Sequence, residues 1–235
     1  MDSEPRPPLA SYEDLAGKIV HSLLRPELAA PEVLEGLRLA RRLGVGSAVV
    51  RPCDIELAAR HLDGSRVAPA SVVGFPHGWQ TTSVKLFEAR DLVRRGARHI
   101  GVAVGVPRLV AREFQHVQTE LAQIVEACHK EGAWVTAILE GGWLTYELKI
   151  IALRCCESAE ADGVSAASGF GPTAGSIEDL QLMRKYLPEE TAVEATGVET
   201  LAQALEAYAA GASRFATGNT AAILEEWKAR LTAAT

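Results

Sequence analysis

The sequence AWVTAIL occupies residues 133–139 and is followed by LTYELKIIALRCCESAEA at residues 144–161. The first run is short and apolar, which is typical of a buried strand. The second run carries apolar residues at the three- and four-residue spacings of an amphipathic helix. Asp162-Gly163 then marks where this helix must stop before the next short run, Gly163–Ser165. The stretch therefore predicts one strand–helix unit of a parallel sheet.

The same alternation runs along the whole chain. It predicts further strands at 18–22, 46–51, 70–74, 99–104, 191–195 and 213–216. It predicts helices at 31–43, 54–63, 82–96, 107–130, 144–161, 176–187, 199–210 and 219–231. Strand–helix units with short connections indicate a parallel sheet, and eight of them are the number that closes a single-domain α/β fold of the (β/α)8 TIM barrel type. A doubly wound open sheet ranks second.

Composition narrows the functional classes. The chain has 235 residues, of which 48% are hydrophobic, so one barrel with a sizeable core is expected. A net charge of −6 without a basic stripe argues against nucleic-acid binding. No apolar run reaches the ~18 residues that a membrane span needs, so we expect no membrane partner. The cysteines show no paired metal spacing, which predicts reduced thiols in a cytoplasmic protein.

The start of the chain and the known cofactor motifs add little. Residues 1–10 are Pro-rich and acidic and lack the features of a signal peptide, so we expect a flexible tail ahead of a barrel at 11–235. No dinucleotide-binding glycine pattern follows a strand, and no phosphate loop of the Walker type is present. The histidines do not form a ligand set. We therefore expect no metal and no cofactor.

Six segments carry a resemblance to a known enzyme family. They are HSLLRP at 21–26, VVGFP at 72–76, TTSVK at 81–85, ILEGG at 138–142, SGFGP at 168–172 and IEDLQLMR at 177–184. In this order they resemble deoxyribose-phosphate aldolase, a class I aldolase, from about residue 12 to 224. The resemblance implies a barrel in which a lysine forms a Schiff base with an aldehyde. A second lysine and an aspartate assist, and Gly-rich loops hold the substrate phosphate.

The residues to which the resemblance assigns catalysis are replaced in this chain. Ser165 stands at the Schiff-base lysine of the sixth strand, Glu194 at the second lysine on the seventh, and Gly101 at the aspartate on the fourth. A hydroxyl cannot form an imine, so the nucleophile of the aldolase reaction is missing. We therefore predict that the chain does not cleave 2-deoxyribose 5-phosphate.

The phosphate end of the family site is altered as well. One glycine after Thr196-Gly197 is missing, and Glu199 stands where the family has an arginine. Backbone amides around Gly169–Gly171 and Gly218-Asn219 still offer an anion site at helix starts. A carboxylate near a phosphate dianion opposes its binding in a partly dry pocket. We therefore expect an unphosphorylated ligand.

In such barrels the site lies at the C-terminal ends of the strands. Glu194 is the leading candidate for a general acid or base, because burial in the barrel mouth raises the pKa of a carboxyl group. Ser165 and His77 are the other catalytic candidates. The predicted ligand-binding residues are Arg51, Trp79, Glu140, Trp143, Ser168, Gly169, Thr196, Gly197, Gly218 and Asn219.

Structural roles remain open for these residues. Glu194 could simply pair with a donor such as Arg51 or His21, and Ser165 could be a small polar filler, since no base is identifiable beside it. His21 and Glu140 have family counterparts, which favours structural roles, and a lone histidine is more often a hydrogen-bonding residue than a proton carrier. The tryptophans could stack on a ligand or anchor their loops.

Three functions stay open. The first is an enzyme that acts by acid–base catalysis on a small organic molecule, as a lyase, isomerase or cyclase. The second is a non-catalytic ligand-binding or regulatory protein, favoured by the inert residues Gly101, Ala166 and Ala167. The third is an aldolase that uses another lysine such as Lys85, for which we instead predict a surface role, because an imine lysine must be desolvated inside the barrel. The resemblance implies a homodimer, although no apolar surface stripe shows one.

Overall fold

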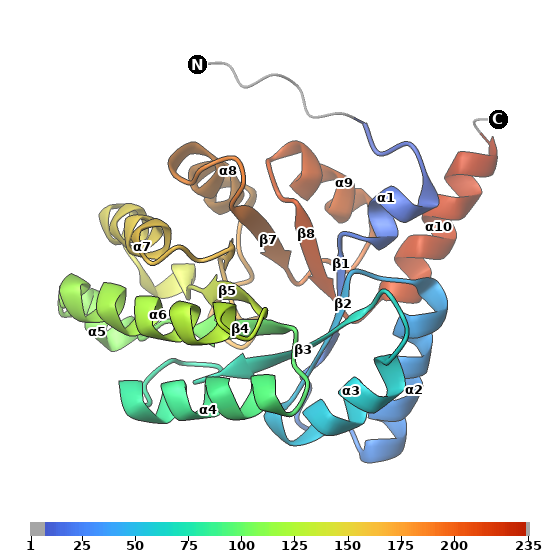
Figure 1. Ribbon diagram of the computed structural model, residues 1–235. Coiled ribbons are helices and arrows are strands. Elements are labelled where there is room, and N and C mark those ends of the chain that lie inside the picture. Colours follow the sequence, from blue (N-terminus) through green and yellow to red (C-terminus); the bar gives the residue numbers. More distant parts are fainter. Residues whose placement is uncertain (1–7, 234–235) are drawn as a thin grey trace.

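The computed structural model describes residues 8–233 of the chain (Figure 1). Parallel strands pair in sequence order and close into a barrel, in which β1 contacts both β2 and β8. The strands are β1 Ile19–Leu23, β2 Ser47–Val50, β3 Ala68–Val73, β4 His99–Ala103, β5 Trp134–Ile138, β6 Gly163–Ser165, β7 Ala192–Thr196 and β8 Arg214–Thr217. The predicted single-domain (β/α)8 barrel is confirmed.

Helices surround the strands and follow them in turn (Figure 1). They are α1 Tyr12–Ala16, α2 Ala30–Leu43, α3 Ile55–Leu62, α4 Thr82–Arg94, α5 Val106–Val110, α6 Phe114–His129, α7 Tyr146–Ser158, α8 Ile177–Tyr186, α9 Leu201–Ala209 and α10 Thr220–Ala233. Short 3-10 turns, η1 Pro52–Asp54 and η2 Gly141–Trp143, follow β2 and β5. Residues 1–7 of the predicted tail lie outside the described residues, whereas Leu9 packs against the core.

The helix predicted at 107–130 is instead two helices, α5 and α6. Between them Arg112 has a φ of 60°, in the left-handed region, and the chain turns with the Glu113 amide donating to the Arg108 carbonyl at 2.9 Å. No glycine or proline marks this break, so apolar spacing alone carried the prediction through it. The short helix α1 was likewise not predicted from the sequence.

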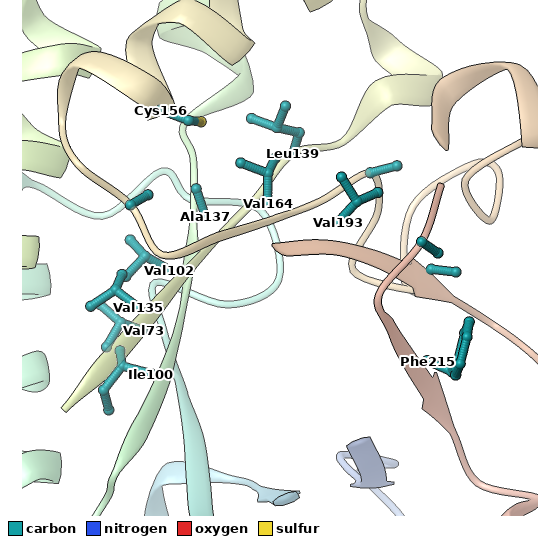
Figure 2. Close-up of a cluster of buried hydrophobic side chains, with 14 of the residues drawn as sticks. Val73, Ile100, Val102, Val135, Ala137, Leu139, Cys156, Val164, Val193 and Phe215 are labelled. Atoms are coloured by element: carbon teal, nitrogen blue, oxygen red, sulfur yellow. The ribbon is translucent and has the colours of Figure 1, made fainter. Parts of the chain in front are cut away.

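Successive residues of each strand face opposite sides of the barrel wall. The outward set packs against the helices and forms the main core; Figure 2 shows Ile100 and Val102 of β4 beside Val135 and Ala137 of β5 in this layer. The inward set forms a second, smaller cluster. Its buried members are Val20, Val49, Ala70, Val72 and Ile138. The outer layer holds the fold together, and the inner set shapes the space inside the barrel.

A buried ion pair lies in the outer layer, between α4 and α6. Lys85 is fully buried, and its Nζ donates to Glu120 Oε1 at 2.6 Å and to the Ala103 carbonyl at 3.0 Å. The predicted surface role of Lys85 is therefore wrong. Sequence position on a helix did not reveal the compensating carboxylate, which comes from a different helix.

We expect Lys85→Met to destabilise the fold by about 3–5 kcal/mol, because it leaves the Glu120 carboxylate buried without its cation. Chemical denaturation followed by circular dichroism measures the change. The double variant Lys85→Met with Glu120→Leu should recover much of this loss, since it buries no charge. A single variant as stable as the natural chain would contradict the structural role given to the pair.

Candidate active site

A cavity of about 400 Å³ lies inside the barrel toward the C-terminal ends of the strands. Its lining comes from all eight strands or from the loops that follow them. The predicted site residues that line it are Ser165, Ser168, Gly169, Glu194, Thr196, Gly197, Gly218 and Asn219. Barrel enzymes place their active sites at this end, so the cavity is the candidate active site.

One side of the cavity is apolar. The inner cluster of β1, β2, β3 and β5 residues lines it, and the rings of Phe75 and Phe170 meet edge to face, with centroids 5.3 Å apart. A Cβ atom at Gly101 would lie 2.9 Å from Ile138 Cδ1. The isoleucine side chain therefore fills the space beside Gly101, the position to which the resemblance assigns an aspartate.

The part of the lining on β6 and β7 is polar. The Ser165 and Thr196 hydroxyl oxygens lie 2.8 Å apart, and each lies within hydrogen-bonding distance of the Ala167 carbonyl, at 3.1 and 2.9 Å. The two hydroxyl protons can serve two of these three contacts. Ser165 contacts no base in the described part of the chain, which favours its reading as a small polar filler over a nucleophile.

Glu194 lies beside Ser165 on the neighbouring strand and is only 8% exposed. Its Oε2 lies 3.6 Å from Arg214 Nε, too far for a hydrogen bond, and has no hydrogen-bond partner among the described residues. Burial raises the pKa of Glu194, and the Arg214 guanidinium only partly opposes this shift. The partner of Glu194 is thus Arg214, and neither Arg51 nor His21.

Arg214 belongs to a network that crosses the barrel interior. Its Nη2 donates to Ser47 Oγ at 2.8 Å and to His99 Nδ1 at 3.3 Å, and its guanidinium lies 4.7 Å from the centre of the Trp134 ring. Because arginine only donates, His99 Nδ1 accepts, so His99 Nε2 carries the proton and donates to Thr136 Oγ1 at 2.8 Å. Burial also holds the pKa of His99 well below its usual range.

The sequence pattern did not predict this network. Its members stand on β2, β4, β5 and β8, and only closure of the barrel brings them together. A signal was present, since Arg214 and His99 share the strand phase of the inward residues Ala216 and Gly101. A charged or polar residue in the inward phase of a barrel strand is itself an indication of an interior network.

Lysines are absent from the cavity lining throughout residues 8–233. Lys85 lies behind the wall in its ion pair, and Lys149 pairs with Asp179 at 2.6 Å on the helical layer. The amine that a Schiff base needs is therefore not present at this cavity.

In the glycine-rich loops, several backbone N–H groups already donate to side chains of the same chain. The Asn219 amide donates to Thr217 Oγ1 at 2.9 Å, and the Phe170 amide donates to Ser168 Oγ at 3.0 Å. The Glu199 amide donates to the Gln203 side chain at 2.8 Å. These loops therefore offer fewer amides to an anion than their glycine content suggests, and the Glu199 side chain lies in the same lining.

Other predicted site residues do not line the cavity. Arg51 pairs with Asp54 at 2.7 Å and donates to the Pro26 carbonyl at 3.1 Å. The rings of His77 and Trp79 contact each other with centroids 4.7 Å apart, on a loop where the Trp79 side chain is 69% exposed. Trp143 is 60% exposed. Ligand contacts by these residues remain predictions for the rim of the barrel.

The two residues with family counterparts have structural contacts. Glu140 Oε1 accepts from the Ser168 amide at 2.8 Å, and a Cβ atom at Gly171 would lie 1.9 Å from Glu140 Oε2. Glu140 thus holds the β6–α8 loop against β5. His21 lies within hydrogen-bonding distance of Thr220 Oγ1 at 2.8 Å, and burial lowers the pKa of this histidine to about 4.

Metal sites and membrane-spanning helices are the other classes of feature to consider in residues 8–233. Across residues 8–233, no three histidine, cysteine, aspartate or glutamate side chains gather in a way that suits a metal ion. In the same part of the chain, no helix has the length and apolarity to span a membrane.

Known proteins match this chain over most of its length. The deoxyribose-phosphate aldolase of Caldanaerobacter subterraneus subsp. tengcongensis is 34% identical over 220 residues, covering 93% of this chain and 95% of its own. That of Thermoanaerobacter pseudethanolicus is 35% identical over 216 residues, covering 91% and 97%. The chain belongs to the deoxyribose-phosphate aldolase family. No family model matches it.

Solved aldolase structures have the same fold. The chain superposes on an aldolase named QR15 with a TM-score of 0.88 and 28% identity, covering 94% of this chain and 99% of the other. It superposes on the tetrameric deoxyribose phosphate aldolase of Aeropyrum pernix with a TM-score of 0.84 and 28% identity, covering 94% of each. The family resemblance is therefore confirmed for both sequence and fold.

Glu194→Gln should change how stability depends on pH. Because the folded state raises the pKa of Glu194 above its ordinary 4.5, the stability that this group contributes is complete below 4.5 and is lost as pH rises through the folded value. The variant has no carboxyl group to ionise there. Urea unfolding from pH 4 to 8 should therefore show a smaller loss at high pH for the variant. Parallel curves for both proteins would contradict the raised pKa.

Proposed function

We propose that this member of the aldolase family acts by acid–base catalysis on a small, unphosphorylated organic molecule and forms no Schiff base. The observation that carries the proposal is the Glu194 carboxyl group, buried in the cavity lining with one oxygen that has no hydrogen-bond partner in the described residues. Burial raises the pKa of this carboxyl group, which favours its protonated form and suits it to proton transfer.

The residues around Glu194 support this role. The guanidinium of Arg214 lies 3.6 Å away and stabilises the carboxylate whenever Glu194 has given up its proton. The Ser165 and Thr196 hydroxyls line the same cavity, where they contact each other and the Ala167 carbonyl. Glu194 moves the proton, Arg214 offsets the charge, and the hydroxyls orient the substrate.

The ordinary family reaction needs a primary amine and phosphate donors at the site, and the proposed mechanism uses neither. A Schiff base needs a desolvated primary amine at the substrate, and Ser165 and Glu194 stand where the resemblance places the two lysines. Phosphate binding needs donors, whereas the loops that would supply them bond to Thr217, Ser168 and Gln203 of the same chain. The Glu199 carboxylate adds repulsion at the same end.

The absence of imine chemistry is tested by borohydride reduction in the presence of acetaldehyde. We expect the intact mass of the natural chain to stay unchanged, because no amine reaches the cavity. The aldolase of Thermoanaerobacter pseudethanolicus provides the positive control. An adduct on any lysine that maps to the cavity, or cleavage of 2-deoxyribose 5-phosphate at the control's rate, would overturn this part of the proposal.

The variant Ser165→Lys serves as a positive control for the borohydride experiment. Ser165 lines the cavity, so a lysine placed there brings an amine into it. We expect this variant, and not the natural chain, to gain the mass of one reduced acetaldehyde. This gain would show that the reagents enter the cavity and that the missing amine is the reason for the negative result.

The acid–base role is tested by proton exchange. Small hydroxy- and amino-carbonyl compounds without phosphate are incubated with the protein in D2O, and deuterium on carbon is followed by NMR. We expect exchange with the natural chain and a loss of about 100-fold or more with Glu194→Gln, the usual scale for a general base. Glu147→Gln, which removes an exposed carboxylate on α7, is the matched control.

A non-catalytic ligand-binding protein is the second candidate. It is favoured by the inert lining at Gly101 and Ala167 and by the engagement of the Ser165 hydroxyl with neighbouring groups. If the natural chain shows no deuterium exchange, or exchanges at the same rate as Glu194→Gln, this candidate is favoured over the catalytic proposal. A homodimer, as the resemblance implies, remains a separate proposal that solution mass measurements decide.

A further inference from the structure

A second cleft lies outside the barrel interior, at the helical layer where α4, α5 and α6 lie side by side (Figure 1). Its volume of about 570 Å³ falls in the range of small-molecule sites. The lining comes from the loop between β3 and α4, the first turn of α4, and parts of α5 and α6. It shares no residue with the lining of the barrel cavity, so a ligand of this cleft is independent of the chemistry proposed for Glu194.

Trp79 presents an aromatic ring at this cleft, on a loop that close contacts hold in place. Gly78 just before it has a φ of 70°, and a Cβ atom there would lie 2.6 Å from the Ala103 carbonyl oxygen. The Gly78 amide donates to the Gly74 carbonyl at 2.8 Å, and the ring of Trp79 contacts that of His77. Trp79 is nevertheless 69% exposed. A large apolar ring that is held in place and uncovered offers a surface for the apolar face of a ligand.

Hydroxyl groups line the same cleft along the start of α4. Thr82 Oγ1 donates to Glu120 Oε2 at 2.7 Å, so its proton is used within the protein. Thr81 Oγ1 and Ser83 Oγ lie 3.2 Å apart. This single contact uses one of their two protons, which leaves the other free to donate to a ligand. Successive helical residues point in directions about 100° apart, so the polar contacts of this turn are spread out rather than gathered at one point.

The charged groups at the cleft are paired within the protein. Glu120 accepts from the fully buried Lys85 at 2.6 Å, and Arg108 pairs with Glu113. The Nε2 atom of His116 lies 3.9 Å from Glu120 Oε2, so a proton on this ring is also offset. A charged ligand would lose part of its hydration without meeting an unpaired counter-ion in this lining. The cleft therefore favours an uncharged ligand.

We propose that this cleft binds an uncharged pyranose ring, with one apolar face of the sugar on Trp79 and its hydroxyls meeting Thr81 and Ser83. A pyranose carries C–H groups on its faces and hydroxyls around its edge. This arrangement matches one aromatic ring and polar groups that are spread over a helical turn. The inference goes beyond the proposed function, because it concerns a separate part of the protein and a ligand that need not react.

The test compares four probes with six-membered rings: methyl β-D-glucopyranoside, methyl β-D-glucuronide, cyclohexylmethanol and benzamide. NMR titration of the full, 15N-labelled chain follows the indole N–H signals and gives the Kd of each probe. The equatorial hydroxyls of the glucoside leave both faces of its ring apolar. We expect the glucoside to bind with a Kd of about 1–10 mM, on the scale of a few contacts in one open cleft. The glucuronide lacks a counter-ion and the other two lack the ring of hydroxyls, so each should bind about threefold or more weakly.

Variants locate the binding at this cleft. Trp79→Ala should weaken the glucoside about tenfold or more, whereas Trp79→Phe should keep most of the affinity, because an aromatic face remains. Phe87→Ala is the matched control, since it removes another exposed aromatic ring that lies outside the cleft lining, and it should leave the affinity unchanged. Ala216→Leu narrows the barrel cavity and should also leave the affinity unchanged.

Three results would overturn the inference: no binding of the glucoside, an affinity that survives Trp79→Ala, or a glucuronide, cyclohexylmethanol or benzamide that binds as tightly. Loss of glucoside binding in Ala216→Leu would place the sugar inside the barrel and would overturn it as well. Proton exchange by Glu194 in D2O is measured separately. The failure of either proposal therefore leaves the other standing.

Discussion

Arg214 and Glu194 are buried side by side inside the barrel, and each loses its hydration there. The neighbouring side chains must therefore compensate both charges. Arg214 keeps its position through Ser47 and the face of Trp134, which come from two other strands. Removing either charged partner would leave the other buried without compensation. The polarity of the cavity, the raised pKa of Glu194 and the tautomer of His99 all follow from this one arrangement.

The two faces of each strand explain how the family fold persists with a different interior. Val102 and Val164 belong to the outer hydrophobic core (Figure 2), whereas Gly101 and Ser165 on the same strands line the cavity. Substitutions in the inward phase therefore change the cavity without altering the side chains of the outer packing layer. Membership of the aldolase family is compatible with a cavity lining that holds no lysine among the described residues, since fold and chemistry depend on different residues.

The spacing of apolar residues predicted helices and strands well where one face of the element packs against the apolar core. It failed at Arg112, where a left-handed residue splits the predicted helix, because no residue type there signals the turn. It failed at Lys85, because the carboxylate that compensates this buried cation stands on another helix. Both errors come from contacts between residues that the periodic pattern of a single element cannot report.

The order of strands and helices was readable from the sequence alone, because apolar periodicity is a local property that each segment carries with it. Ser165 and Glu194 were also readable at the positions to which the resemblance assigns lysines, since residue identity does not depend on folding. Only the tertiary structure decided which groups surround Glu194. Arg214 and His99 are 115 residues apart, and they meet only because the eighth strand returns to the first and closes the barrel around them.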